Sequence, residues 1–167
     1  MDIISHGLWG GIAFGRRNKR QFWWSFFFGI MPDLLSFGIL TASVWLGIGI
    51  APDWSGGPPA MSSIPSYVSS LYNVTHSLVV FVVVFLIAWL ILKRPPLVML
   101  AWPLHIIVDI FTHTSAFFPT PFLWPIFNVK VSLISWADPR IFIPNVLLLL
   151  IVYAIYYVRS KKASARV

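Results

Sequence analysis

The sequence contains no cysteine and no glutamate, and only 10% of its residues are charged. Without cysteine the chain can form neither a disulfide framework nor a thiolate metal site. A soluble domain of this size would have about 25% charged residues, whereas 58% of the residues here are hydrophobic. This composition excludes an ordinary soluble domain and indicates an integral membrane protein.

Because glutamate is absent, the acidic side chains of the protein are five aspartates: Asp2, Asp33, Asp53, Asp109 and Asp138. Three of them lie outside the apolar runs and are expected to be solvated. Asp33 and Asp109 lie inside apolar runs, where an ionisable side chain is costly and normally faces the interior of a helix bundle at a functional site. Carboxylate chemistry within the membrane must therefore use these two residues.

The net charge of +7 does not indicate a nucleic-acid partner, because the basic residues lie in short clusters beside apolar runs. Ten of the twelve form three clusters: Arg16, Arg17, Lys19 and Arg20; Lys93 and Arg94; Arg159, Lys161, Lys162 and Arg166. Clusters of this kind mark the cytoplasmic side of a membrane protein. We therefore expect a multi-pass protein of the cell membrane whose basic loops and C-terminus are cytoplasmic.

At roughly 20 residues per membrane helix, the 167 residues have room for about four or five helices. We expect a single all-α domain over residues 1–167, a polytopic membrane bundle of about five helices. The first helix is too short to cross a bilayer, and its glycines favour close packing inside the bundle. The expected helices, followed by the basic tail, cover residues 3–15, 22–50, 74–92, 97–118, 141–158 and about 159 onward.

The second helix is predicted to kink at Pro32, because proline removes a backbone hydrogen bond and clashes with the preceding turn. A break there would place Asp33 in the first turn of the continuing half-helix, where free N–H groups favour an anion. Residues 51–73 form the main outer loop, with a short interfacial helix near 62–72. Residues 119–139 are predicted to be an aromatic loop along the outer interface, with a lid or substrate entrance as the alternative.

A polar stripe of His105, Asp109 and His113 runs along the fourth helix at positions i, i+4 and i+8. At a rise of 1.5 Å per residue from the cytoplasmic ends, His105 lies roughly 14 Å deep and Asp109 roughly 18 to 20 Å deep. By the same measure His6 lies at the depth of His105, Asp33 lies at the depth of Asp109, and His76 lies at roughly 24 Å. Five groups from four segments are thus predicted to converge. His113 lies nearer the outer interface, where a histidine is ordinary, and we leave it out of the site.

Imidazole nitrogen and carboxylate oxygen are the ligands that zinc and similar divalent metals take, with three protein ligands and a water in a typical catalytic site. We therefore predict a divalent metal, zinc by preference, bound by His6, Asp33, His76, His105 and Asp109. Asp33 is either a further ligand or the general base that orients the attacking water, and it is the predicted catalytic residue.

The predicted site residues stand in four short motifs: His6 near the start, Pro32–Asp33, Thr75–His76–Ser77, and His105 with Asp109. These motifs resemble those of the bacterial membrane-bound metal-dependent hydrolase family, which includes the LexA-regulated inner-membrane hydrolase. The resemblance implies a location in the inner membrane, a bound divalent metal and a hydrolytic reaction.

The chain departs from this family's pattern at two places. Leu34 and Leu35 follow the Pro-Asp pair where family members often have a further aspartate. Leu71, Tyr72 and Asn73 stand where a His-Arg-Gly run often precedes Thr-His-Ser. One carboxylate and one imidazole are thus missing, which favours a single-metal site over a two-metal site.

The predicted function is a membrane-embedded hydrolase that acts on a phosphate or carboxylic ester of an amphiphilic substrate. Membrane lipid surrounds the protein, and the site's depth in the membrane is what points to a lipid-like substrate. The alternatives are a non-enzymatic carrier of metal ions or protons, and a polar cluster that only orders the bundle. A carrier needs a polar path to both faces, and few polar groups lie between the site and the cytoplasmic ends.

Overall fold

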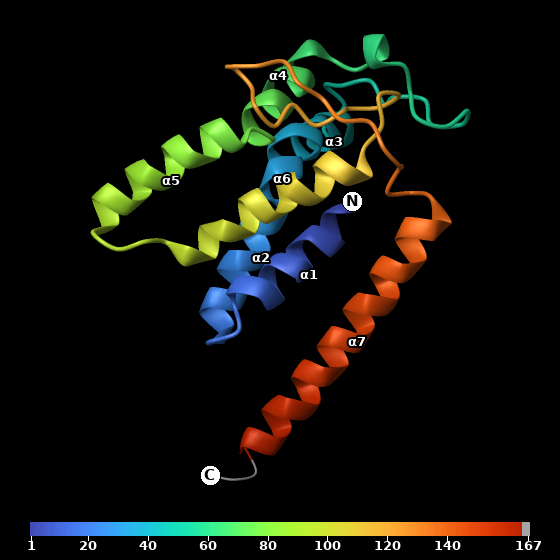
Figure 1. The fold of residues 1–167 in the computed structure, drawn as a ribbon. Helices are drawn as coiled ribbons and strands as arrows, with labels where there is room; N and C mark the ends of the chain where they lie inside the picture. The colour runs from blue at the N-terminus through green and yellow to red at the C-terminus, as the bar shows by residue number, and fades with distance from the viewer. Residues whose placement is uncertain (165–167) are drawn as a thin grey trace.

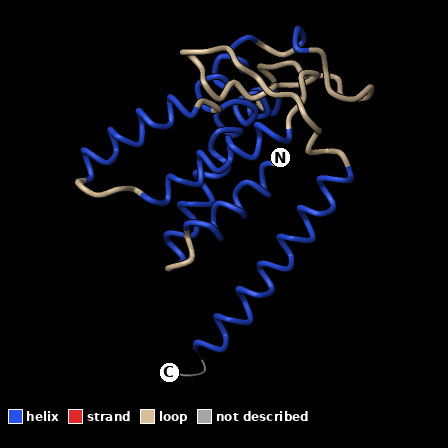
Figure 2. The backbone as a smooth tube through the Cα atoms, in the orientation of Figure 1, coloured by secondary structure: helices blue, strands red, loops and turns tan. Residues whose placement is uncertain are grey.

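The structure, a computed structural model, describes residues 1–164. This range is helical and contains no strand beyond one isolated bridge, so the all-α prediction is confirmed. Figures 1 and 2 show the helices and the loops that join them. The elements are α1 (Ile3–Phe14), α2 (Lys19–Asp33), a π-helical turn (Leu34–Gly38), α3 (Ile39–Trp45), a 3-10 turn (Met61–Ser63), α4 (Ser66–Thr75), α5 (Leu78–Leu92), a 3-10 turn (Leu97–Leu100), α6 (Ala101–Thr112) and α7 (Pro139–Ser164).

Helices α1 and α2 form an antiparallel pair whose backbones touch (Figure 1). A Cβ atom built on Gly29 would lie 2.5 Å from the carbonyl oxygen of His6, and one built on Gly10 would lie 2.8 Å from the carbonyl oxygen of Ser25. Only glycine permits so close an approach at these two positions. The pair packs against α6, and this three-helix contact places His6 beside the polar stripe of α6.

Helix α2 does not break at Pro32, so the break that the sequence analysis considered there is absent. The chain continues through the π-helical turn into α3, and Lys19–Trp45 forms one run of 27 residues. The wider turn absorbs the local misfit that a proline introduces. The Pro32 carbonyl accepts hydrogen bonds from the hydroxyls of Ser36 (3.0 Å) and Thr75 (3.1 Å). Asp33 therefore lies inside a continuous helix and not at a free helix N-terminus.

The break occurs instead between α4 and α5, at His76 and Ser77, where the two helix axes differ by 60°. Ser77 caps α5, since its Oγ accepts a hydrogen bond from the Val80 amide (3.1 Å). The predicted helix over 74–92 is therefore interrupted at His76 and Ser77, and its continuous part begins at Leu78. Helix α5 alone has 15 residues, and it reaches a spanning length only when it is taken together with α4.

Helix α6 ends at Thr112, so the predicted span over 97–118 is too long. His113 has an extended backbone with φ −114° and ψ 155°, and the chain passes into a loop that reaches Asp138. The loop packs on the α4–α5 junction: the Leu78 amide donates to a loop carbonyl, that of Phe122, at 2.9 Å. The aromatic loop expected at the outer interface thus covers the helix break.

Helix α7 lies beside α1 and makes few contacts with the remaining helices (Figure 1). Three polar contacts of 2.8 Å join the pair. The indole N–H of Trp9 donates to Asn145 Oδ1, the Asn145 amide donates to Ser5 Oγ, and the Tyr153 hydroxyl donates to the Leu8 carbonyl.

Asp138 immediately precedes α7, and its carboxylate accepts hydrogen bonds from the Arg140 guanidinium and amide. These bonds lower the pKa of Asp138 to about 2, so the residue is ionised at neutral pH and favours the helix start. The apolar part of α7 ends at Arg159, close to the predicted end of the last span, and the helix continues into the basic tail as far as Ser164. Arg166 lies outside the described residues.

Two helical runs are long and apolar enough to cross a membrane, Lys19–Trp45 and Pro139–Arg159, and the bent α4–α5 pair makes a third if it is counted as one span. The α1 and α6 segments are apolar but shorter. Lipid-like surroundings suit α5 and α7, where Leu90, Ile91 and Leu150 are 63–73% exposed. The expectation of about five membrane helices holds only in coarser form, as a helical chain with membrane-compatible helices.

The described parts of the three basic clusters lie at one end of the molecule. Arg17 of the α1–α2 turn and Arg94 of the segment after α5 line the same pocket. The Tyr156 hydroxyl, near the end of α7, lies 3.5 Å from the Arg16 carbonyl. The long loops gather at the other end (Figure 2).

Candidate metal centre

Four polar side chains meet in the interior: Asp33 from the end of α2, His76 from the α4–α5 break, and His105 and Asp109 from α6. One potential ligand atom of each lies within 4.8 Å of the others. The side chains of His76, His105 and Asp109 are fully buried, and that of Asp33 is 16% exposed. The group could hold a metal ion, as the sequence predicted for these four residues.

The spacing of His105 and Asp109 puts both on the face of α6 that packs against α1 and α2. His105 Nε2 lies 3.1 Å from Asp109 Oδ2. Trp102, on the same helix, donates its indole N–H to the Thr75 carbonyl at 2.6 Å. This bond holds α6 against the end of α4, directly before His76.

The helix break orients His76. Its Nδ1 lies 3.2 Å from the Tyr72 carbonyl and 3.1 Å from the Thr75 hydroxyl, and the Tyr72 ring stacks on the imidazole with 3.7 Å between centroids. Because a carbonyl can only accept, we assign the proton to Nδ1, which leaves a lone pair on Nε2. Nε2 lies 3.4 Å from Asp33 Oδ1 and 3.7 Å from Asp109 Oδ2.

His105 has the same arrangement on the other side of the group. Its Nδ1 lies 2.7 Å from the Gly29 carbonyl, so this ring also has its lone pair on Nε2. The Nε2 atoms of His105 and His76 are 3.0 Å apart. A backbone carbonyl on the second nitrogen is the usual support of a metal-binding histidine. Both imidazoles are therefore prepared to bind one cation between them.

The two carboxylate oxygens of Asp109 have different surroundings. Oδ1 lies 2.8 Å from His6 Nε2 and also contacts the Met1 amino group. Oδ2 is buried and has no hydrogen-bond donor among the residues that the structure describes. A buried acceptor without a donor is costly. A divalent cation would bind this oxygen and the lone pairs of His76 and His105 at once, so the residues fit a metal.

His6 lies beside the four-residue group and is not one of its members. Its ring stacks on that of His105 with 3.6 Å between centroids, and its Nε2 is directed at Asp109 Oδ1. In this position it orients Asp109, the role that a hydrogen-bonded neighbour of a metal ligand usually has.

His113 lies closer to the four-residue group than the membrane depth estimated from the sequence suggested. Its Nδ1 is 3.3 Å from the Asp109 carbonyl and 3.5 Å from Asp109 Oδ1. The early end of α6 explains the difference, because the extended backbone at His113 replaces the further helical turn that the sequence analysis assumed.

Sequence reasoning missed two supporting residues, Tyr72 and Gly29. Tyr72 stacks on His76, and its hydroxyl donates to the Phe118 carbonyl at 2.9 Å. This bond joins the loop between α6 and α7 to the site. Its position four residues before His76, one helical turn away, was a usable signal. Gly29 contributes only its carbonyl oxygen, which no sequence pattern marks.

Comparison of the chain with protein-family models, with curated proteins and with solved structures found no match. The resemblance described above therefore rests on the four short motifs alone.

Proposed function

We propose that the protein is a membrane-embedded hydrolase that uses one divalent metal ion, zinc by preference. The observation that supports this most directly is the meeting of His76 Nε2, His105 Nε2 and the donor-free Asp109 Oδ2 in one buried place. Two nitrogens and one oxygen are a ligand set that catalytic zinc sites use, with a position left for water. When bound, the metal supplies Lewis-acid chemistry and makes water a usable nucleophile near neutral pH.

Asp33 is the candidate for the catalytic base. It is the one member of the four with an exposed side-chain fraction, 16%, so a substrate reaches the group on this side. Its Oδ1 lies 3.4 Å from His76 Nε2 and 3.9 Å from His105 Nε2, close enough to accept a proton from an attacking water beside them. His6 and the two carbonyls that support the imidazoles hold the ligands in place.

The substrate class follows from location. We propose an inner-membrane, multi-pass protein with the basic end in the cytoplasm, as the charge distribution favours. The long runs Lys19–Trp45 and Pro139–Arg159 support a membrane location. The side chains of Leu34 and Leu35, which follow Asp33, are 37% and 43% exposed, so apolar surface borders the open side. An amphiphilic ester, such as a phospholipid or a polyprenyl phosphate, suits this opening.

The test combines metal analysis with a hydrolysis panel. The protein is purified in non-ionic detergent, loaded with zinc, and assayed on lipid phosphates and lipid carboxylic esters. We expect activity that a chelator abolishes and zinc restores, and that Asp33→Asn reduces by about 100-fold or more. Asp53→Asn, in the exposed outer loop, is the matched control and retains activity.

The same preparation separates the hydrolase from the two alternatives. A carrier moves metal ions into sealed proteoliposomes without hydrolysing any lipid, and a purely structural cluster binds no metal. Failure of zinc to bind the wild type at all would remove the basis of the hydrolase proposal.

A further inference from the structure

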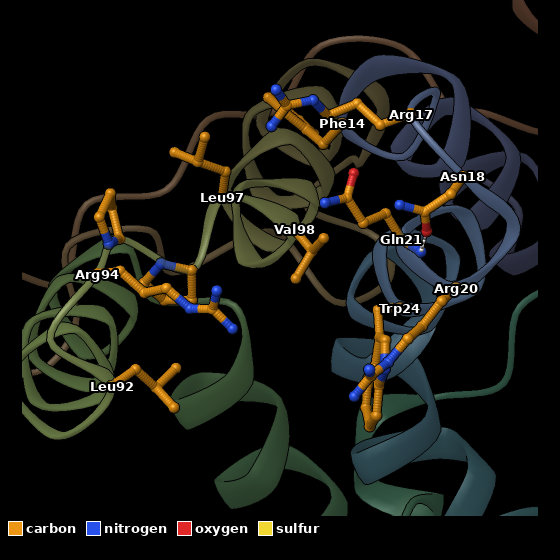
Figure 3. A pocket seen from close by; sticks show the side chains of 12 residues that line it. Phe14, Arg17, Asn18, Arg20, Gln21, Trp24, Leu92, Arg94, Leu97 and Val98 are labelled. Atoms are coloured by element: carbon orange, nitrogen blue, oxygen red, sulfur yellow. Dashed lines mark hydrogen bonds between the residues drawn. The ribbon is translucent and has the colours of Figure 1, made fainter.

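A second site lies at the basic end of the bundle, between the α1–α2 turn and the segment that joins α5 to α6. The pocket there has a volume of about 480 Å³, and Figure 3 shows its lining side chains. The pocket shares no residue with the metal centre. Val98, which lines the pocket, precedes His105 by seven positions, which corresponds to about 10 Å along a helix. The lining residues are Phe14, Arg17, Asn18, Arg20, Gln21, Trp24, Leu92, Arg94, Pro95, Pro96, Leu97 and Val98.

The charge of this pocket is uncompensated. Arg17, Arg20 and Arg94 line it from two segments far apart in the sequence, and no acidic side chain does. None of the three guanidinium groups has an ion pair or hydrogen bond to another of the described residues. Arginine guanidinium groups bind phosphate through paired, charge-assisted hydrogen bonds. Three of them around one cavity therefore favour a phosphate group as the ligand.

Apolar side chains border the same cavity. Trp24, Leu92 and Leu97 line it and are 48–54% exposed. In Figure 3 Trp24 lies beside Arg20, and Leu92 lies on the side of Arg94. A free phosphate ion gains nothing from such a border, whereas a lipid places its phosphate among the arginines and its chains along the apolar side chains. Tryptophan beside basic residues is also typical of a membrane–water interface.

We propose that this pocket binds the phosphate headgroup of an anionic phospholipid on the side of the membrane where the basic end of the protein lies. The lipid joins the α1–α2 turn to the segment after α5, two parts of the chain whose basic side chains repel each other when the pocket is empty. This site is independent of the proposed hydrolase activity.

The experiment uses the full chain in non-ionic detergent, where no membrane surface potential is present. Binding of dioctanoyl phosphatidylglycerol is measured by native mass spectrometry, with dioctanoyl phosphatidylcholine and inorganic phosphate as further probes. The pocket variant is Arg20→Gln with Arg94→Gln. The control is Arg16→Gln with Lys93→Gln, which removes two charges from the same turns at positions that do not line the pocket.

We expect the pocket variant to bind phosphatidylglycerol at least about tenfold more weakly than the wild type and the control, since each lost charge-assisted bond weakens binding by about tenfold. An equal loss in both variants would show diffuse attraction and overturn the proposal. Unchanged binding in both variants would overturn it as well. Competition by inorganic phosphate as strong as that by the lipid would show a free-phosphate site in place of a lipid site. Circular dichroism verifies that both variants fold.

Discussion

The two oxygens of Asp109 divide the centre into a supporting side and a binding side. Oδ1 contacts His6, and Oδ2 faces the lone pairs of His76 and His105 without a donor. Asp109→Asn places an amide in the group, whose N–H₂ cannot bind a cation. We expect zinc affinity to fall about 100-fold or more, measured by plasma mass spectrometry after dialysis against zinc buffers. Asp53→Asn should retain the metal, and equal metal content in the two variants would contradict the site.

Thr75 offers a second test, because its hydroxyl supports a ligand without being one. It lies 3.1 Å from His76 Nδ1 and donates to the Pro32 carbonyl. Thr75→Val keeps the shape of the side chain and removes both contacts, so we expect zinc affinity to fall about tenfold. Thr41→Val is the control, since the Thr41 hydroxyl bonds only its own helix, at the Phe37 carbonyl. Zinc content after dialysis against zinc buffers is measured for both variants, and a loss for the control as large as for Thr75→Val would refute the assigned role.

At the residue level the sequence predicted which groups converge, because ionisable side chains in apolar runs have few other places to go. It predicted His6 as a metal ligand, whereas the structure places His6 Nε2 at Asp109 Oδ1 and outside the four-residue group. The difference depends on which Asp109 oxygen each neighbouring side chain contacts, and the membrane depth estimated from the helical rise does not predict this.

Among the elements, the broken helix was predicted at the wrong place. Pro32 looked decisive, yet a π-helical turn absorbs it. The break at His76 has no local proline or glycine to announce it. It is stabilised by residues far away in the sequence, because the loop between α6 and α7 provides acceptors for the Leu78 amide and the Ser77 hydroxyl. A local reading of the sequence could not include these partners.

Ser77 should therefore stabilise the break. Its Oγ caps α5 at the Val80 amide and donates to the Trp124 carbonyl. Ser77→Ala removes both bonds, and we expect the free energy of unfolding to fall by about 1–2 kcal/mol. Ser70→Ala is the comparison, because Ser70 is exposed and bonds only the Ser66 carbonyl of its own helix. Thermal unfolding in detergent measures both, and equal melting temperatures would disprove the capping role.

The contact of α1 with α2 gives a prediction for Gly29. Its Cβ would lie 2.5 Å from the His6 carbonyl oxygen, so Gly29→Ala must push the helices apart. We expect a loss of about 1–3 kcal/mol in unfolding free energy, together with weaker zinc binding through His105. At Gly38 the nearest atom is the flexible end of Leu34 at 3.3 Å, and Gly38→Ala should be close to neutral. If both variants unfold alike, the close contact is not what positions His105.

For the whole molecule, hydropathy predicted helices in a membrane but overestimated how far several of them extend. Helix α6 is the clearest example. Its sequence stays apolar beyond Thr112. However, the Trp136 amide donates a hydrogen bond to the Thr112 carbonyl at 2.9 Å, and the Leu133 amide donates one to the His113 carbonyl at 3.3 Å. These bonds come from residues more than 15 positions away, so composition alone could not locate the helix end.

The orientation of the chain is testable because the sequence has no cysteine to give background. Ser55→Cys lies in the loop between α3 and α4 and Lys19→Cys at the basic start of α2, and both positions are exposed. If the basic end is cytoplasmic, a membrane-impermeant maleimide labels Ser55→Cys in spheroplasts and labels Lys19→Cys only after lysis. The reverse pattern would invert the proposed topology.

Helix α7 contributes none of the four side chains of the centre, and three polar contacts with α1 are its principal attachment. The whole four-residue centre thus lies in residues 1–137, and α7 is a separate helix attached to them. Expressed as two separate pieces, the first 137 residues should assemble the centre unaided, and the remaining helix should rejoin them inside the bilayer through Asn145.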